Sequence, residues 1–246
     1  MDSATGPAWR RRARPLLGTL VEVGLCAAGP DADAAAESAF AAIHEVQRCL
    51  SRFDVDSDIA RFHALPAGQS LRLRPATRAV LAAAAELHGA SEGDFDISLG
   101  SAPRGWRLEG DELHKLDAGA RLDAGGIAKG HAVDLAVSAL LERGCAAGWV
   151  NAGGDLRAFG DVEVPVLLRD EITGGVRRFA TLQQGAFATS HFDRGSRATL
   201  THRRRAHVSV AAPQCLWADA LTKIVAIRGD TDDPVLARYQ ASAWLH

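Results

Sequence analysis

The chain is short of the features that mark several large classes of protein. Its 246 residues carry 28 basic and 30 acidic side chains, so no excess of one charge attracts nucleic acid or an anionic membrane. The four cysteines never form a C-x-x-C pair, which removes a common zinc signature and favours buried thiols in a reducing compartment. No stretch approaches the roughly 18 apolar residues of a membrane-spanning helix.

The start of the chain resembles an export signal in outline only. The basic run Arg10-Arg11-Arg12 precedes an apolar stretch, as it would in a signal peptide. However, Glu22 interrupts that stretch, and residues 20–23 have the alternation of a strand. We therefore expect an unexported, cytoplasmic protein.

The periodicity of apolar residues predicts a fold with both helices and strands. Helices are expected over 31–50, 75–87, from the Gly125-Gly126 turn to Arg143, over 216–226 and from Pro234. Strands are expected over 16–25, 95–99, 121–123, 147–151, 156–159, 162–169, 176–182, 186–190, 198–202, 207–211 and 241–245. Helices and hairpins follow no regular βαβ alternation, which is typical of an α+β fold. Since no linker divides the chain, we expect one domain over 15–246 after a disordered basic segment over 1–14.

The stretch from residue 121 to 160 has the features of a ligand-binding region. Two glycine pairs, Gly125-Gly126 and Gly153-Gly154, lie on either side of one amphipathic helix, and each has an aspartate within three residues. Glycine lets backbone groups approach a ligand closely, and a helix starting there would point its positive end at an anion. The stretch matches neither the Walker phosphate motif nor G-x-G-x-x-G. An anion site and a pair of ordinary glycine-rich turns therefore stay equally open.

Several short motifs follow one another in an order that is more specific than any one of them. They are LGT at 17–19, SRFDVDSDIARF at 51–62, FDISLG at 95–100, LDAGGIAKGHAVD at 122–134, VNAGGDLRAFG at 150–160, ATS at 188–190 and HVSVAAPQCLWADALTK at 207–223. Taken together they resemble the FAD:protein FMN transferase family, also called ApbE. The resemblance runs from Leu16 nearly to the C-terminus.

The resemblance implies a fold, a reaction and partners. The fold would be ApbE-like, with largely antiparallel sheets packed with helices. Members of the family bind FAD and Mg²⁺, split the pyrophosphate, and join FMN through its phosphate to a Thr or Ser of an acceptor protein, with AMP leaving. For this chain it implies FAD as substrate, Mg²⁺ as cofactor and an acceptor protein as partner. It also adds a cell-envelope or periplasmic location as the alternative to the cytoplasm.

The resemblance also assigns residues to the FAD site. Asp123 and Lys129 would touch FAD. The other residues that would lie around the flavin nucleotide are Leu17, Phe53, Phe95, Asp96, Asn151, Gly153, Gly154 and Asp155. Without the resemblance, Phe53 would be interpreted as a core residue. The glycines at 153 and 154 would be interpreted as part of a tight hairpin turn.

The chain departs from the family at the expected metal site. The metal ligands implied are the carbonyl of Gly126 with the side chains of Asp219 and Thr222. The family usually has a Thr four residues after this Asp, but here that position is Lys223, which cannot bind Mg²⁺ while protonated. Either Thr222 reaches the metal from one position earlier, or the metal site is altered. The alternative for Asp219 is an ordinary exposed carboxylate on a helix.

A second departure concerns the catalytic base. His202 begins the family's histidine motif, but Arg203-Arg204-Arg205 replace most of the rest. We predict that His202 is the base and that Asp219 is the other catalytic residue. An ordinary histidine at the end of a strand is an equal alternative for His202. His191 is the reserve candidate for the base. The main hypothesis is therefore a Mg²⁺-dependent FMN transferase. The alternative is a homologue that binds FAD but has lost transfer, as a flavin-binding protein or a slow FAD pyrophosphatase.

Overall fold

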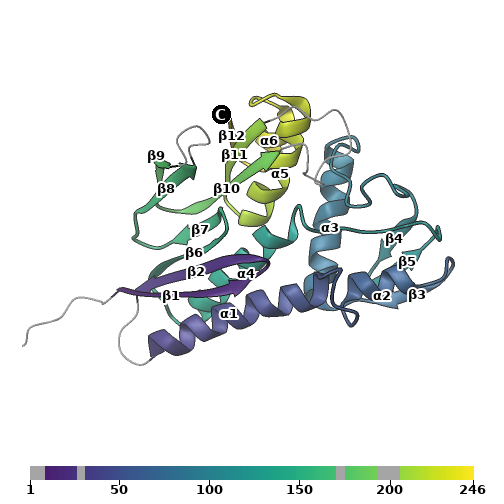
Figure 1. Cartoon of the computed structure of the whole chain (residues 1–246), viewed down its shortest axis with the longest axis horizontal. Helices are drawn as coiled ribbons and strands as arrows, with labels where there is room; N and C mark the ends of the chain where they lie inside the picture. Colours follow the sequence, from purple (N-terminus) through teal and green to yellow (C-terminus); the bar gives the residue numbers. More distant parts are fainter. Residues whose placement is uncertain (1–8, 27–30, 170–174, 193–205) are drawn as a thin grey trace, which may run out of the picture.

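A computed structural model describes residues 9–26, 31–169, 175–192 and 206–246 (Figure 1). Over these residues, six α-helices pack with one seven-stranded sheet and two smaller sheets. Every strand pairing in the described part of the chain is antiparallel. The expected α+β fold of antiparallel sheets and helices is therefore confirmed. None of the described helices is long and apolar enough to cross a membrane.

The seven-stranded sheet forms the centre of the molecule (Figure 1). Its strands lie in the order β1 (Trp9–Leu16), β2 (Thr19–Cys26), β6 (Ala147–Ala152), β7 (Asp155–Phe159), β10 (Gly185–Phe192), β11 (Ala206–Ala212) and β12 (Ser242–Leu245). Alternation along β2 directs Val21, Val23 and Leu25 into the core, where each is fully buried. The larger of two buried apolar clusters includes residues from β2 to Tyr239.

Strand β1 corrects the expectation of a disordered segment over residues 1–14. From Trp9 onward this segment pairs with β2 along its whole length. The turn between the two strands is tight, because Leu17 and Gly18 both take left-handed backbone conformations, with φ of 55° and 71°. The arginines that suggested disorder instead pair with acidic residues on β2 and the helix below: Arg11 with Glu22, Arg12 with Asp33 and Arg14 with Glu37.

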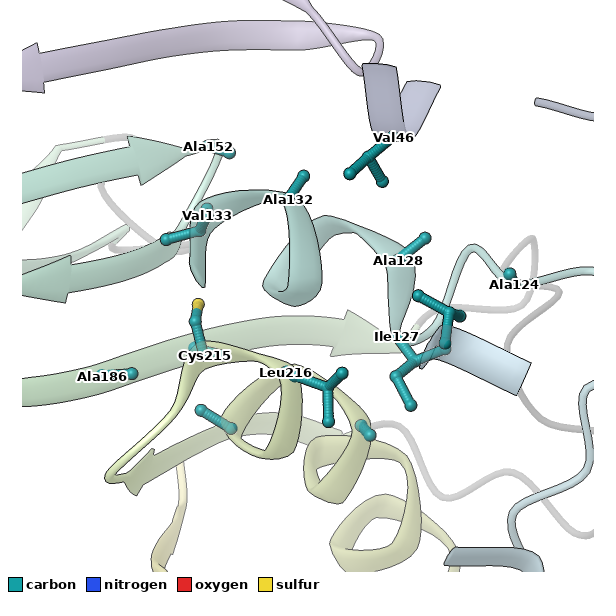
Figure 2. Close-up of a cluster of buried hydrophobic side chains, with 14 of the residues drawn as sticks. Val46, Ala124, Ile127, Ala128, Ala132, Val133, Ala152, Ala186, Cys215 and Leu216 are labelled. Carbon is teal, nitrogen blue, oxygen red and sulfur yellow. The ribbon is translucent and has the colours of Figure 1, made fainter. Parts of the chain in front are cut away.

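Three helices position the central residues of the chain. Helices α1 (Asp31–Leu50), α4 (Ala128–Glu142) and α5 (Cys215–Arg228) lie side by side, with α4 in the middle and in contact with β6 and β7. In Figure 2, Ala128 and Ala132 of α4 point toward Val46 of α1, while Cys215 and Leu216 of α5 lie on its other side. The small side chains of α4 let both neighbours approach closely. Helix α4 is therefore enclosed by packed elements.

The remaining elements lie around this centre. They are α2 (Asp58–Ala64), α3 (Pro75–Ala90), the three-stranded sheet of β3 (Ser70–Arg72), β5 (Glu112–Lys115) and β4 (Trp106–Glu109), the hairpin of β8 (Val164–Arg169) and β9 (Val176–Leu182), and α6 (Pro234–Arg238). The helices expected from periodicity are present at 31–50, 75–90, 128–142, 215–228 and 234–238. The strand expected over 198–202 lies outside the described residues.

Two segments expected to be strands belong to no sheet. Residues 95–99 fold around Asp96, whose side chain accepts hydrogen bonds from the backbone N–H groups of Ser98 and Gly100 at 2.8 and 3.1 Å. Residues 121–123 pair with no strand in the described structure. The N–H of Asp123 donates to the carbonyl of Ile97 at 2.8 Å. Short apolar runs do not separate strands from compact loops, and here the aspartate side chain replaces the strand ladder.

Candidate functional site

Helices α4 and α5 touch through their backbones, and this contact places Asp219. A Cβ added at Gly130 would lie 2.2 Å from the carbonyl oxygen of Cys215, so only glycine allows this approach. One turn further along α4, the carboxylate of Asp134 accepts the N–H groups of Cys215 and Leu216, each at 2.9 Å. Asp134 thus caps the first turn of α5 from a neighbouring helix. As a result, the N–H of Gly130 donates to Asp219 Oδ2 at 3.1 Å.

Four charged side chains meet beside this contact, and we refer to them as the four-charge cluster. Lys129 of α4 pairs with Asp155 of β7, and Lys223 of α5 pairs with Asp219 of the same helix. The ammonium of Lys223 also donates to the carbonyl oxygen of Asp219 at 2.8 Å. Both aspartates are fully buried, so water does not screen these charges. The two lysines and two aspartates together carry no net charge.

The cluster fixes the ionisation of its members. Burial acts to raise the pKa of Asp219, but Lys223 and Lys129 outweigh burial, and the pKa is lowered. Burial and the charge of Asp219 raise the pKa of Asp155 to about 6, although both lysines oppose this. Burial acts to lower the pKa of Lys129, yet Asp155 and Asp219 outweigh it, and the pKa is raised. Asp155 is therefore the member whose charge changes most easily with pH.

Asp155 also carries an unusual oxygen. Its Oδ2 accepts from Lys129, but Oδ1 is buried and has no hydrogen-bond partner among the described residues. A buried carboxylate oxygen without a partner costs free energy, and such atoms are rare away from functional sites. We therefore place Asp155 in the functional site rather than only in the sheet.

Two adjoining cavities open next to the cluster, and we refer to them as the outer cavities. The larger has a volume of about 420 Å³ and includes Leu17, Phe53 and Lys129 in its lining. The smaller has a volume of about 190 Å³, with Phe95, Asp96 and Gly126 in its lining. The residues common to both linings are Arg52, Asp123 and Gly125. The structure thus brings together seven residues that the sequence assigned to a ligand or metal: Leu17, Phe53, Phe95, Asp96, Asp123, Gly126 and Lys129.

Arg52 joins the two outer cavities, and the sequence did not point to it. Its guanidinium donates to Asp123 Oδ2 at 3.3 Å and lies over the ring of Phe53, 4.7 Å from the ring centre. Phe53 is 82% exposed, so its interpretation as a core residue is wrong. Asp123 Oδ1 in turn accepts the N–H of Gly125 at 2.9 Å. The available signal was the position of Arg52 in the motif SRF, directly before Phe53.

The other expected FAD contacts have local roles as well. Leu17 holds a left-handed backbone conformation, and its N–H donates to Gln47 Oε1 at 2.7 Å. Phe95 is buried at the base of the smaller cavity. The carboxylate of Asp96 accepts bonds within its own loop, including one from the hydroxyl of Ser98 at 2.7 Å. These residues shape the walls of the cavities.

The second glycine pair is a hairpin turn that faces a different cavity. Gly153 and Gly154 form the two-residue turn between β6 and β7, with φ of 64° and 107°, as the alternative interpretation predicted. Asn151 Oδ1 accepts the N–H of Gly154 at 3.1 Å. These three residues line a third cavity, of about 510 Å³, whose lining includes none of the residues of the outer cavities. Of the four residues expected at the pocket floor, Asp155 alone pairs with a residue of the outer cavities, Lys129.

The expected metal ligands lie close together, with Lys223 among them. Asp219 is fully buried, so its interpretation as an exposed carboxylate is wrong. A Cβ added at Gly126 would lie 3.2 Å from Cε of Lys223, which places the lysine stem against this glycine. The hydroxyl of Thr222 donates to the carbonyl oxygen of Asp219 at 2.7 Å and is bonded to Ser190 Oγ at 2.9 Å. The position four residues after Asp219 therefore supplies an ammonium, not an oxygen.

The sequence offered two histidines as candidate bases. His202 is outside the described residues. His191 is on β10, where its ring lies beside that of His207, with 5.7 Å between ring centres. Among the described residues that line the outer cavities, His191 does not occur.

Known proteins resemble the chain in sequence and in structure. A curated relative, the FAD:protein FMN transferase of Rhodobacter capsulatus, is 29% identical over 71% of this chain, which spans only 42% of the relative's length. The flavin transferase ApbE of Vibrio cholerae superposes with a TM-score of 0.81 at 18% identity, over 97% of this chain and 93% of the other. The flavinyl transferase ApbE of Pseudomonas stutzeri, in its apo form, gives 0.83 at 23% identity, over 100% and 92%. At these identities the two structures establish the shared fold.

The family assignment comes from the sequence model of the family. The model of the ApbE family matches residues 17–116 and 103–244, which is most of the chain. The match includes the outer cavities, the four-charge cluster and the hairpin at Gly153-Gly154. The chain therefore belongs to the ApbE family.

Proposed function

We propose that this chain is an FAD:protein FMN transferase, which moves FMN from FAD to a Thr or Ser hydroxyl of an acceptor protein and releases AMP. The observation that carries the proposal is the position of Lys129. It lines the larger outer cavity and is anchored from behind by the buried Asp155. A fixed cation beside a cavity large enough for part of a nucleotide suits the binding of a pyrophosphate.

The residues of the outer cavities divide the work of binding. Phe53 offers an exposed ring for stacking, and Arg52 lies over that ring with its charge next to Asp123. Gly125 and Gly126 lie just before α4, where the positive end of the helix favours an anion. Lys129, whose pKa is raised because Asp155 and Asp219 outweigh the effect of burial, stays charged and offsets the charge of the phosphates.

The transfer itself exchanges one P–O bond for another. The acceptor hydroxyl oxygen attacks the phosphorus on the FMN side, the bond to the bridging oxygen breaks, and AMP leaves with the electron pair. The hydroxyl proton must pass to a base, and His202 stays our prediction for that base. Asp219 cannot be reached by the acceptor, since it is fully buried and bonded to Lys223 and Gly130. We infer that Asp219 positions Lys223 and helix α4 rather than moving a proton.

The Mg²⁺ implied by the family resemblance fits these residues poorly. A hard cation needs several free oxygen ligands. Both carboxylate oxygens of Asp219 already accept hydrogen bonds, and the hydroxyl of Thr222 is bonded to Ser190 and to the Asp219 carbonyl. No group of three or more Asp, Glu, His or Cys side chains suited to a metal occurs in the described parts of the chain. In the reaction proposed here, no step uses a metal ion.

The ion pair of Lys223 with Asp219 also favours a second candidate function. A site with an ammonium in place of a divalent cation would stabilise less negative charge during P–O cleavage. The chain would then bind FAD without transferring FMN, or would hydrolyse FAD slowly to AMP and FMN. We also expect a cytoplasmic location, with the cell envelope as the alternative.

The test uses the full chain with FAD and an acceptor protein that carries a flavinylation-site Thr. We expect a fluorescent flavin band on the denatured acceptor and one AMP released per flavin attached. An acceptor with that Thr changed to Ala is the matched control, and an active flavin transferase shows that the acceptor is competent. FAD binding with neither band nor AMP would support the second candidate, and AMP with FMN but no band would support hydrolysis.

A further inference from the structure

We propose that the ammonium of Lys223 takes the place of a divalent cation in this site, so that FAD binding by this chain requires no divalent metal. The inference deepens the proposed function and rests on it for the identity of the ligand. It concerns a residue in which this chain differs from the family pattern. It also predicts a property that separates this chain from a metal-dependent transferase.

The ammonium of Lys223 lies close to the expected metal ligands. Lys223 is only 5% exposed, and its stem lies against Gly126: a Cβ added to that glycine would lie 3.2, 3.7 and 3.9 Å from three carbons of the stem. Gly126 lines the smaller outer cavity. The ammonium at the end of the stem meets the carboxylate and the carbonyl of Asp219. The positive charge therefore lies between the glycine and the aspartate that were expected to share a metal ion.

The oxygens of Asp219 that would bind a metal ion already accept hydrogen bonds. Asp219 Oδ1 accepts from Lys223, Asp219 Oδ2 accepts from the N–H of Gly130 at 3.1 Å, and the Asp219 carbonyl accepts from Lys223 and Thr222. A metal ion would have to displace the ammonium and reach oxygens that are buried. Breaking a buried ion pair is costly, because the remaining charge has no partner.

The charges within the four-charge cluster balance one another. The four-charge cluster has two cations and two anions, so it is neutral before a ligand binds. Before FAD binds, adding Mg²⁺ next to Lys223 and Lys129 would leave two uncompensated positive charges in a buried place. Replacing Lys223 by a neutral residue would leave the cluster with one net negative charge, which is the condition that favours a bound cation.

The ammonium of Lys223 can also attract a negatively charged ligand. A lysine ammonium has three N–H donors, and two of them are directed at Asp219. Lysine binds phosphate as a point charge, without a metal. Lys223 can thus attract a phosphate group held near Gly126 while Asp219 keeps it in place. Because the lysine is part of α5, this charge is present whatever the metal concentration.

The first experiment needs no flavin. Mn²⁺ prefers the same oxygen ligands as Mg²⁺ and can be titrated by electron paramagnetic resonance. We expect the wild-type chain to bind no Mn²⁺ at this site, and Lys223→Thr to bind one ion that excess Mg²⁺ displaces. Lys223→Met is the matched control, since it removes the charge without adding an oxygen, and we expect weaker Mn²⁺ binding than in Lys223→Thr. Wild-type binding of one Mn²⁺ that Asp219→Asn abolishes would overturn the inference.

The second experiment titrates FAD by fluorescence anisotropy in EDTA and in Mg²⁺. We expect the wild-type affinity to differ less than about twofold between the two, and Lys223→Thr to lose about tenfold or more in EDTA, as for a lost charged hydrogen bond. Mg²⁺ should restore Lys223→Thr but not Lys223→Met. Wild-type affinity that collapses in EDTA would contradict the inference, and this holds even if the variants fail to fold.

The two proposals can fail separately. FAD binding that is insensitive to EDTA, without a fluorescent acceptor band, would leave the inference standing and remove the transferase function. A fluorescent band that forms only with Mg²⁺, together with FAD binding that EDTA abolishes, would support the transferase function and overturn the inference. No FAD binding in either condition, with no Mn²⁺ bound, would remove the proposed function and with it the role of Lys223 toward FAD.

Discussion

The outer cavities and the four-charge cluster adjoin at Lys129, yet they are held in place by different forces. Arg52, Phe53 and Asp123 stand on loops at the mouth of the cavities and are partly or largely exposed. Asp155 and Asp219 stand on a central strand and an enclosed helix and are fully buried. Charges at the mouth are screened by water, whereas charges in the cluster are not. We therefore expect changes at the mouth to affect ligand binding, and changes in the cluster to affect folding as well.

The sharpest way to break this comparison is to remove one carboxylate from each region. Asp219→Ala leaves Lys223 buried without its partner, and we expect it to lower the free energy of unfolding by about 3–5 kcal/mol. Asp123→Ala is the matched control. Its side chain is 28% exposed and pairs with the 37% exposed Arg52, so we expect a loss below about 1 kcal/mol. Urea denaturation measures both, and equal losses would show that the two regions do not differ in this way.

A smaller effect distinguishes the cluster by its response to pH. Burial and Asp219 raise the pKa of Asp155 from 3.8 in the unfolded chain to about 6 in the folded one, against Lys129 and Lys223. The stability that Asp155 contributes is therefore complete below its unfolded pKa and is lost as pH rises through about 6. Relative to Asp155→Asn, the wild-type free energy of unfolding should fall by about 2 kcal/mol between about pH 4 and about pH 7.

Denaturant titrations of both chains at several pH values measure this difference. The lowered pKa of Asp219 gives a loss of stability in both chains at more acid pH, below the range in which Asp155 titrates. A difference between the chains that stays constant over the whole range would contradict the coupling of Asp155 to its neighbours.

The smallest effect on folding is expected at the mouth. Phe53→Ala removes a ring that is 82% exposed, so the free energy of unfolding should change by less than about 0.5 kcal/mol. Loss of stacking should weaken FAD binding about three- to tenfold. Phe95→Ala is the matched control, because this ring is 5% exposed, and should lower the free energy of unfolding by about 3–5 kcal/mol. Thermal unfolding and FAD titration separate the two effects, and a destabilised Phe53→Ala would refute the division.

Local pattern in the sequence was enough for the long helices and for the strands of the β6–β7 and β8–β9 hairpins. Apolar spacing predicts α1 with its observed bounds, since that helix buries one face only, chiefly against α4. The segment 95–99 was predicted wrongly as a strand, because a short apolar run fits both a strand and a turn. The basic segment at the N-terminus was predicted wrongly as disordered from residue 9 onward, because strand β1 exists through its pairing with β2.

Motifs in the sequence also identified most of the site before its geometry was known. Asp123, Lys129 and Asp219 come from the glycine stretch and from helix α5, and the structure brings them to one region. Arg52 was missed, because its contact with Asp123 joins residues 71 positions apart. The hairpin at Gly153-Gly154 was expected at the pocket floor, and the fold turns it toward another cavity.

The sequence by itself determined the spacing that places Lys223 one helical turn from Asp219. Only the tertiary structure decided that this pair is buried, that Asp219 also receives the N–H of Gly130, and that Lys129 and Asp155 complete a neutral cluster. The physical reason is that burial and charge balance depend on elements brought together from distant parts of the chain. A lysine on an exposed helix would be a solvated charge, whereas the same lysine enclosed beside Gly126 supplies the cation of the site.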